Sequence, residues 1–299
     1  MMQLVQIGAD SRPARRPDWL KVRIPGGDNY YDLKRLMRGL SLHTVCESAH
    51  CPNIGECWGH RTATFMILGE LCTRRCGFCA VPKGLPQGEL DWEEPERVAS
   101  AANEMGLRYV VVTSVDRDDR KDGGASIFAL TIQALRRKIP ECEVEVLIPD
   151  FRGSDEALET VLGARPDVLS HNIETVPRLY PVARRGSRYP RSLRLLARSR
   201  EFAPGILTKS GLMVGLGETF GEVCGVLADL KTAGVDIVTI GQYLRPSGQQ
   251  LPVARFYTPE DFAALKQEGI RLGLRHVESG PLVRSSYHAH KQAAASRKQ

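Results

Sequence analysis

Residues 72–79 read Cys72-Thr73-Arg74-Arg75-Cys76-Gly77-Phe78-Cys79. The three thiols have the spacing C-x3-C-x2-C, which suits one metal centre better than disulfide bonds among themselves. A cubic cluster of four irons held by three cysteines keeps one iron open to a ligand from outside the protein, whereas electron-carrying clusters are usually closed by four cysteines. Gly77 is expected to permit the unusual backbone angles of such a loop. A structural zinc site is the alternative, although zinc more often takes two C-x2-C pairs or mixed Cys and His ligands.

This motif resembles that of the radical S-adenosylmethionine (SAM) enzymes. The resemblance implies that the amino and carboxylate groups of SAM chelate the open iron of a [4Fe-4S] cluster. It also implies that an electron from the reduced cluster splits SAM into methionine and a 5′-deoxyadenosyl radical. Such a radical removes hydrogen from an unactivated carbon, which is chemistry that no side chain performs unaided.

A second group of cysteines precedes the first. Cys46, Cys51 and Cys57 have the spacing C-x4-C-x5-C, and Pro52 and Gly55 are expected to make turns between them. Buried structural cysteines rarely come as three within about a dozen residues, so this spacing predicts a second cluster.

The composition indicates a large α/β protein rather than a disulfide-stabilised one. The chain has 299 residues, of which 42% are hydrophobic, and six of its eight cysteines lie between Cys46 and Cys79. That clustering indicates metal binding in a reducing compartment, whereas the isolated Cys142 and Cys224 are predicted to be small core residues. No apolar run approaches the ~20 residues of a membrane helix, and residues 1–23 lack the apolar segment of a secretory signal. We therefore predict a cytoplasmic protein with no membrane partner.

From Ala63 onward, apolar runs alternate with segments of helical period. The expected strands are 63–68, 109–114, 143–148, 167–171, 207–214 and 237–243, and their almost continuous apolar character predicts a parallel sheet that is buried on both faces. Helices are expected near 30–38, 95–105, 124–138 and 154–163, and after the capping sequences that begin at Thr219 and Thr258. Periodicity alone fits a barrel or a doubly wound sheet.

The resemblance to radical SAM enzymes implies a partial (β/α)6 TIM-type barrel with N- and C-terminal extensions. The cysteine loop at 72–79 would follow the first strand, at the rim where barrel active sites lie. We expect an N-terminal arm and auxiliary-cluster segment at 1–60, the barrel at 61–274 and a closing C-terminal extension at 275–299.

Polar segments after the other strands are candidates for contacts with SAM. Asn172 and Glu174 are predicted to bind its amino or ribose groups, while His171 is predicted to be a satisfied core histidine. Gly215 and Gly217 are predicted to let the backbone approach a nucleoside closely. The polar segments 115–119 and 242–247 also follow strands, and ordinary solvated turns are the alternative explanation for 115–119.

Three features together resemble the lipoyl synthase family: the cysteine group at 46–57, the cysteine group at 72–79 and the segment Arg284-Ser285-Ser286-Tyr287. The similarity extends from Trp19 to Tyr287. It implies a sulfurtransferase that inserts sulfur at C6 and C8 of an octanoyl chain linked to a lysine of a carrier domain, with one SAM for each insertion. It implies that the auxiliary [4Fe-4S] cluster is the sulfur donor and that Ser286, rather than Ser285, is its fourth ligand. An alkoxide is a hard ligand for a soft site, so iron held by Ser286 is expected to be released readily.

The partners implied by this resemblance are carrier domains of the 2-oxoacid dehydrogenase E2 or glycine-cleavage H protein type, and an electron donor such as ferredoxin or flavodoxin. The net charge is +6, and a basic run extends from Arg184 to Arg200. This run is either a solvated helix face preceded by a loop, which is the more common explanation for any one charge, or a surface that docks an acidic carrier domain. It lacks the interleaved aromatics that stack bases, so no nucleic-acid partner is expected.

Three other functions remain as alternatives. An RNA-modifying methylthiotransferase would carry an additional RNA-binding module, for which no residues remain. A non-enzymatic cluster scaffold or electron carrier would not cleave SAM. An enzyme resembling biotin synthase would lack the cysteine group at 46–57.

Overall fold

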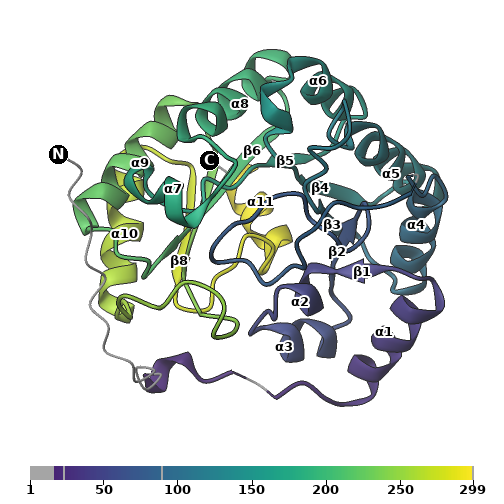
Figure 1. Cartoon of the computed structure of the whole chain (residues 1–299), viewed down its shortest axis with the longest axis horizontal. Helices are drawn as coiled ribbons and strands as arrows, with labels where there is room; N and C mark the ends of the chain where they lie inside the picture. Colours follow the sequence, from purple (N-terminus) through teal and green to yellow (C-terminus); the bar gives the residue numbers. More distant parts are fainter. Residues whose placement is uncertain (1–16, 23, 89, 298–299) are drawn as a thin grey trace.

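The computed structural model describes residues 17–22, 24–88 and 90–297. Within this part of the chain, eight strands form one sheet in sequence order, and helices surround it (Figure 1). The strands are β1 (His43–Thr44), β2 (Thr64–Ile67), β3 (Tyr109–Ser114), β4 (Glu143–Leu147), β5 (Val168–Ser170), β6 (Leu207–Val214), β7 (Ile237–Gln242) and β8 (His276–Gly280). The α-helices are α1 (Asp28–Gly39), α2 (Val45–Ser48), α3 (Ile54–Gly59), α4 (Glu94–Glu104), α5 (Ala125–Lys138), α6 (Asp155–Gly163), α7 (Tyr180–Ala183), α8 (Tyr189–Phe202), α9 (Phe220–Thr232), α10 (Pro259–Arg271) and α11 (Ala289–Arg297).

The sheet is a partial TIM-type barrel. Strands β2 to β8 pair in parallel, and β1 pairs with β2 in the antiparallel direction. The six predicted strands are confirmed as β2 to β7, and the predicted barrel fold is confirmed. The two edge strands, β1 and β8, were not predicted.

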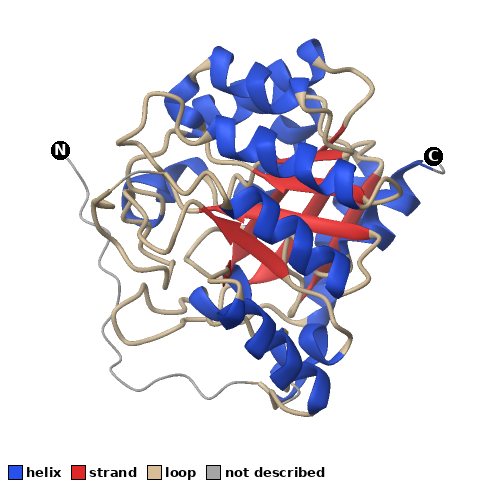
Figure 2. Ribbon diagram, turned by 90° about the vertical axis from the view of Figure 1, so that its right-hand side faces the viewer, coloured by secondary structure: helices blue, strands red, loops and turns tan. Residues whose placement is uncertain are grey.

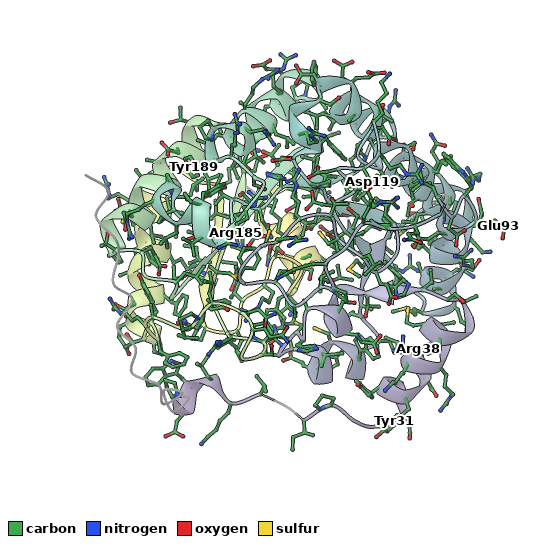
Figure 3. All side chains as sticks on the ribbon, viewed as in Figure 1. Tyr31, Arg38, Glu93, Asp119, Arg185 and Tyr189 are labelled. Atoms are coloured by element: carbon green, nitrogen blue, oxygen red, sulfur yellow. The ribbon has the colours of Figure 1, made fainter. Side chains whose placement is uncertain are left out.

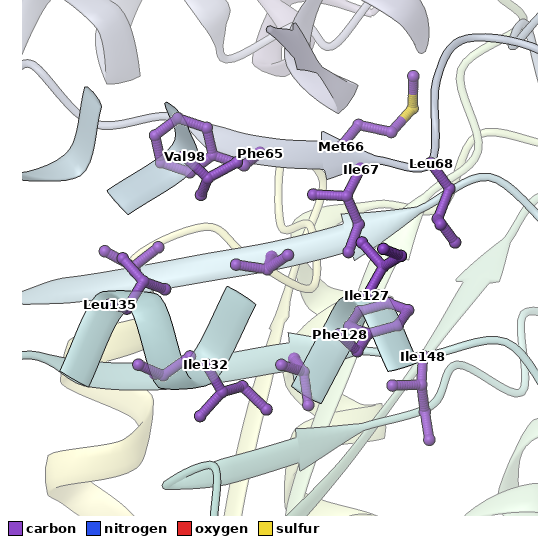
Figure 4. Close-up of a cluster of buried hydrophobic side chains, with 14 of the residues drawn as sticks. Phe65, Met66, Ile67, Leu68, Val98, Ile127, Phe128, Ile132, Leu135 and Ile148 are labelled. Carbon is purple, nitrogen blue, oxygen red and sulfur yellow. The ribbon is translucent and has the colours of Figure 1, made fainter. Parts of the chain in front are cut away.

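The hydrophobic core lies between the sheet and the helices outside it. Figure 4 shows Phe65 and Ile67 of β2 on the helix-facing side of the strand, with Met66 on the opposite side. Phe65, Ile67 and Phe128 are completely buried in this cluster. Burial of each such side chain contributes roughly 2 kcal/mol, so the β2–α5 region is a rigid base for the loop that follows β2.

Side-chain caps fix where the helices that follow the strands begin. Thr219 forms the predicted capping box at α9, and Thr258, the predicted start of α10, also forms one. The Ser154 hydroxyl accepts a hydrogen bond from the backbone N–H of Ala157 at α6. These caps satisfy N–H groups that have no partner within the helix. No helix in the described part of the chain is both long and apolar enough to cross a membrane.

The two ends of the barrel differ. The loops that follow the strands gather at the left of Figure 2, and the C-terminus with α11 lies at the right. Near the α11 end, Ala293 packs with Val168, Leu207 and Ile237. Active-site chemistry in such barrels lies at the other end, where the strands finish.

Candidate active site

The predicted cysteine loop follows β2 at the carboxyl ends of the strands. The backbone N–H of Cys72 donates to the carbonyl of Pro82 at 2.9 Å, and its thiol accepts from the backbone N–H of Asp116 at 3.4 Å. Burial raises the pKa of Cys76 to about 12 and that of Cys79 to about 11, and it also raises the pKa of Cys72. Such thiols stay protonated near neutral pH unless a metal replaces the proton.

Gly77 serves packing rather than unusual backbone angles, so that expectation was wrong. Gly77 does not have a positive φ angle. A Cβ at this position would lie 2.9 Å from the carbonyl oxygen of Val182 and 3.0 Å from the Leu251 side chain. The loop is therefore pressed against α7, where the Gly77 N–H donates to the carbonyl of Ala183 at 2.9 Å.

Arg74 joins the cysteine loop to two other strand ends. Its guanidinium lies 2.8 Å from Asp118, 3.2 Å from Asp116 and 2.5 Å from Asp150, and its side chain is only 3% exposed. These carboxylates raise the pKa of Arg74 against the effect of burial. The predicted polar segment at 115–119 thus holds the loop in place, which sequence reasoning did not identify.

In the second cysteine group, Cys46 lies on α2, Cys57 on α3 and Cys51 in the turn between them. Burial raises the pKa of Cys46 to about 12 and that of Cys57 to about 11, with the neighbouring Cys51 adding to both. The pKa of Cys51 is also raised by burial, and Arg284 opposes this. These three cysteines are free thiols, as are the three of the loop after β2.

The segment Arg284–Tyr287 is tied to this second group. The side-chain amide of Asn53 donates to the carbonyl of Leu282 at 2.7 Å, and the Tyr287 hydroxyl lies 3.0 Å from Glu56, next to Cys57. These two hydrogen bonds bring together residues that lie 229 and 231 positions apart in the sequence.

A cavity of about 70 Å³ opens between the ends of the central strands and the C-terminal segment. Asn172 and Glu174 line it together with Ser285 and Arg284, and the Asn172 amide donates to Glu174 at 3.0 Å and to the Ser285 hydroxyl at 3.4 Å. The predicted SAM-contacting pair therefore lies beside the Arg284–Tyr287 segment. The Asn172 Oδ1 atom is buried and has no hydrogen-bond partner among the described residues.

Two arginines face Glu174. Burial raises the pKa of Glu174, while Arg184 and Arg284 oppose this rise. Arg184 is buried and donates to the hydroxyls of Tyr180 at 3.0 Å and Ser192 at 2.9 Å, and no ion pair joins it to a described residue. It also lowers the pKa of Cys76 against burial, so its positive charge faces the cysteine loop as well.

His171 is a satisfied core histidine, as predicted. It is completely buried, and its two ring nitrogens lie 2.8 Å from the Ile148 carbonyl and 2.9 Å from the Ser192 hydroxyl. Burial, with Arg184 nearby, lowers its pKa to about 3. The isolated Cys142 is also completely buried, and Cys224 is partly buried against the core.

The predicted glycines after β6 approach the chain's own backbone. Gly215 has a φ of 106°, and a Cβ there would lie 2.2 Å from Gln242 Nε2 and 2.6 Å from the carbonyl of Arg255. Gly217 has a φ of 109°, which also favours glycine. The Gln242 side chain bonds the carbonyl of Arg255 at 3.0 Å, so this polar residue is structural.

The predicted basic docking run does not form a single free surface. Arg184 is buried, so its assignment to a solvated face was wrong. The arginines of α8 pair within the chain: Arg191 with Asp150, Arg194 with Asp155, Arg198 with Asp155 and Glu201, and Arg200 with Asp236. Only Arg185 and Arg188 are exposed without an ion pair to a described residue.

The donor sets fit iron–sulfur clusters. Each set offers three free thiols on short segments, and soft thiolates are the ligands such clusters use. Among the described residues, no three His, Cys, Asp or Glu side chains converge closely enough to share one metal ion. Thiolates on a four-iron cube bind different irons and need not converge in that way.

Comparisons with known sequences match two regions of the chain to family models. Residues 66–230 match the radical SAM superfamily, and residues 4–51 match the N-terminal domain of lipoyl synthase of the radical SAM family. A protein of Koribacter versatilis (strain Ellin345) named lipoyl synthase is 60% identical over 97% of this chain and 96% of its own length. A second protein of that name, from Rubrobacter xylanophilus, is 62% identical over 95% of this chain and 88% of its own length.

Solved structures share the fold. Methylornithine synthase (PylB) has a TM-score of 0.53 at 14% identity, covering 88% of this chain and 82% of its own. SuiB of Streptococcus suis bound to its precursor peptide has a TM-score of 0.55 at 13% identity, covering 85% of this chain and 55% of its own.

Proposed function

The chain belongs to the lipoyl synthase family of the radical SAM superfamily, and from this we propose which of its residues bind each cluster and SAM. It is a sulfurtransferase that inserts two sulfur atoms, at C6 and C8 of a protein-bound octanoyl-lysine, to form the lipoyl group. It uses SAM and two [4Fe-4S] clusters. When bound, these groups supply the hydrogen-abstracting radical and the sulfur.

Cys72, Cys76 and Cys79 are our proposed ligands of the cluster that binds SAM. Asn172 and Glu174 would hold the amino or ribose groups of SAM, since the buried Asn172 Oδ1, which has no partner in the described part of the chain, leaves an acceptor available. Arg184 would face the carboxylate of SAM, because its buried guanidinium forms no ion pair with a described residue and a second anion beside Glu174 would offset its charge. Gly215 and Gly217 remain predicted contacts of the nucleoside.

Cys46, Cys51, Cys57 and Ser286 are our proposed ligands of the auxiliary cluster. The single observation that carries this proposal is the pair of hydrogen bonds, Asn53 to Leu282 and Tyr287 to Glu56, that hold the Arg284–Tyr287 segment against α3. The family resemblance favours Ser286 over Ser285, and the lining of the cavity by Ser285, which accepts from Asn172, supports that choice. Arg284 would offset the negative charge of thiolates, since its charge acts on Cys51.

The substrate is a lipoyl-carrier protein. We infer that carriers of the E2 and glycine-cleavage H protein types are its substrates. We also infer that a ferredoxin or flavodoxin supplies electrons and that the enzyme works in the cytoplasm. We further propose the division into an N-terminal auxiliary-cluster segment (1–60), a barrel (61–274) and a closing segment (275–299).

Two triple variants test the assignment of the clusters. Replacing Cys72, Cys76 and Cys79 by Ala should abolish reductive cleavage of SAM and remove about half of the iron. Replacing Cys46, Cys51 and Cys57 by Ala should remove the other half and abolish sulfur insertion, while 5′-deoxyadenosine still forms. Loss of SAM cleavage in both variants, with each retaining half of the iron, would contradict the division.

A further inference from the structure

We propose that four arginines at the mouth of the barrel, Arg75, Arg152, Arg185 and Arg188, form the surface on which an acidic carrier domain docks. We call this set the arginine rim. The proposal rests on the proposed function and names where its protein substrate binds. It replaces the helix face that the sequence suggested.

The arginine rim lies on three segments that Arg74 joins. Arg75 is next to it in sequence, and the Arg74 guanidinium donates to the Ser187 hydroxyl at 2.9 Å, between Arg185 and Arg188. Arg152 lies two residues after Asp150, which pairs with Arg74 at 2.5 Å. In the view of Figure 3, Arg185 lies near the middle of the molecule, whereas Arg38 and Glu93 lie toward its edge.

The three nearby carboxylates are largely offset by two arginines, which leaves one negative charge against the four positive charges of the rim. Asp116, Asp118 and Asp150 pair with Arg74, and Asp150 also pairs with Arg191. The four arginines of the rim are exposed, and none forms an ion pair with a described residue. An uncompensated positive field therefore remains at the mouth, and such a field attracts an acidic surface.

The arginine rim also has an apolar centre. Val182 is 43% exposed, and its carbonyl lies against Gly77 of the cysteine loop. Protein interfaces commonly combine an apolar centre with a polar border. Val182 lies three residues before Arg185, so the rim combines an exposed apolar side chain with exposed arginines.

The location suits a substrate that is attached to a protein. The acyl chain must reach the end of the barrel where Glu174 and the cysteine loop lie, because Ala293 of α11 packs into the opposite end. The rim consists of residues that follow β2, β4 and β5 at that same end. A domain docked there holds its modified lysine over the mouth.

The experiment compares a rim triple variant, Arg75→Gln/Arg185→Gln/Arg188→Gln, with a control triple variant, Arg108→Gln/Lys138→Gln/Arg165→Gln. The control removes the same charge from exposed residues that precede β3, β4 and β5 at the other end of the barrel. The holoenzymes are assayed with dithionite as reductant, on an octanoylated carrier domain of negative net charge and on a short octanoyl-lysine peptide.

We expect the rim variant to raise KM for the domain roughly tenfold at low ionic strength, since three exposed ion pairs at a fraction of a kcal/mol to about 1 kcal/mol each combine to such a factor. KM for the peptide should change less than about twofold, and the salt dependence of KM for the domain should weaken. The control should resemble the parent enzyme.

Three results would overturn the docking surface: an unchanged KM for the domain, an equal rise in KM for the peptide, or an equal effect of the control. If a flavodoxin reduces the rim variant slowly while the dithionite-driven KM is unchanged, the surface serves the electron donor and the proposal is wrong. If the parent enzyme inserts no sulfur into the octanoylated domain, the proposed function fails instead, whatever the variants do.

Discussion

The Nη2 atom of Arg74 lies 2.5 Å from the Oδ1 atom of Asp150, and the Asp150 side chain is completely buried. This ion pair joins the cysteine loop after β2 to the end of β4, across the intervening strand β3. It positions the loop before any cluster binds, because the partners of Arg74 belong to the protein itself.

Arg74→Gln should destabilise the fold by about 3 kcal/mol, since it leaves buried carboxylates without their counter-charge. Iron bound at the cysteine loop should fall as well, whereas the auxiliary cluster is retained. Denaturant unfolding and iron analysis under anaerobic conditions measure both effects. Arg271→Gln, which breaks an exposed pair with Glu268, serves as the control and should leave the unfolding midpoint unchanged.

The raised pKa of the buried Glu94 side chain should make the stability of the protein depend on pH. Burial raises its pKa from 4.5 to about 7, although its carboxylate accepts from the Leu68 N–H at 2.8 Å. Between those pH values the folded chain holds a proton that the unfolded chain has lost. The free energy of unfolding therefore falls as the pH rises from about 4.5 to about 7, by roughly 3 kcal/mol.

The Glu94→Gln variant tests this dependence, because Gln keeps an acceptor for the Leu68 N–H without the titration. Denaturation across pH 4.5 to 8 should give a flatter profile than that of the parent protein. Glu93→Gln makes the same charge change on an exposed neighbour and should keep the parent slope. Parallel profiles for the parent and Glu94→Gln would show that Glu94 does not bind this proton.

Ser286→Ala and Ser286→Cys should reduce sulfur insertion by more than about a hundredfold if Ser286 is the cluster ligand that we propose, because loss of a ligand costs more than loss of the residues that hydrogen-bond to it. The uncoupled formation of 5′-deoxyadenosine should continue. Ser285→Ala is the matched control, since it removes only the 3.4 Å contact with Asn172. Unchanged sulfur insertion by Ser286→Cys would argue against a labile serine-bound iron.

Arg184→Gln should weaken SAM binding at least about tenfold, because a buried charge pair contributes about 2 kcal/mol or more. Equilibrium dialysis of SAM with the oxidised holoenzyme measures the dissociation constant without turnover. Arg185→Gln, one residue along and exposed, should bind SAM normally. If both variants bind SAM like the parent enzyme, Arg184 does not bind the carboxylate of SAM, and another anion offsets its charge.

Gly241→Ala should displace the C-terminal segment. Its Cβ would lie 2.1 Å from the backbone carbonyl of Val283 and 3.0 Å from the Arg284 guanidinium. We expect a loss of about 2 kcal/mol in stability and a loss of sulfur insertion, with SAM cleavage less affected. Gly221→Ala in α9, where no atom of a described residue outside that stretch of helix lies within 4 Å of the new methyl group, should be neutral or slightly stabilising in unfolding experiments.

Most of the fold was predictable because its strands are apolar and its helices carry caps. The strand β8 was missed because its residues, His276 to Gly280, are mostly polar and only Val277 is buried. The two-residue strand β1 is too short to show a period. The helix α11 has no capping sequence and an alanine-rich face, so its burial against β7 and β8 could be seen only in the structure.

The candidate site divides in the same way. Thiol spacing is local, so both cysteine groups could be recognised from sequence. Arg74 was missed because its partners lie 42 to 76 positions away, counting from Asp116 to Asp150. Arg184 was misjudged because burial depends on Tyr180 and Ser192, which pack around it only in the folded chain.

The hydrogen bonds from Asn53 to Leu282 and from Tyr287 to Glu56 set an order of assembly during translation. The ribosome releases residues 281–287 after every strand of the sheet has been synthesised. If Ser286 is a cluster ligand as we propose, the auxiliary centre can be completed only after β8 has emerged, whereas all the residues that we propose for the other cluster have been synthesised by then. A nascent chain stalled shortly before residue 281 would be expected to mature one centre and leave the other unfinished.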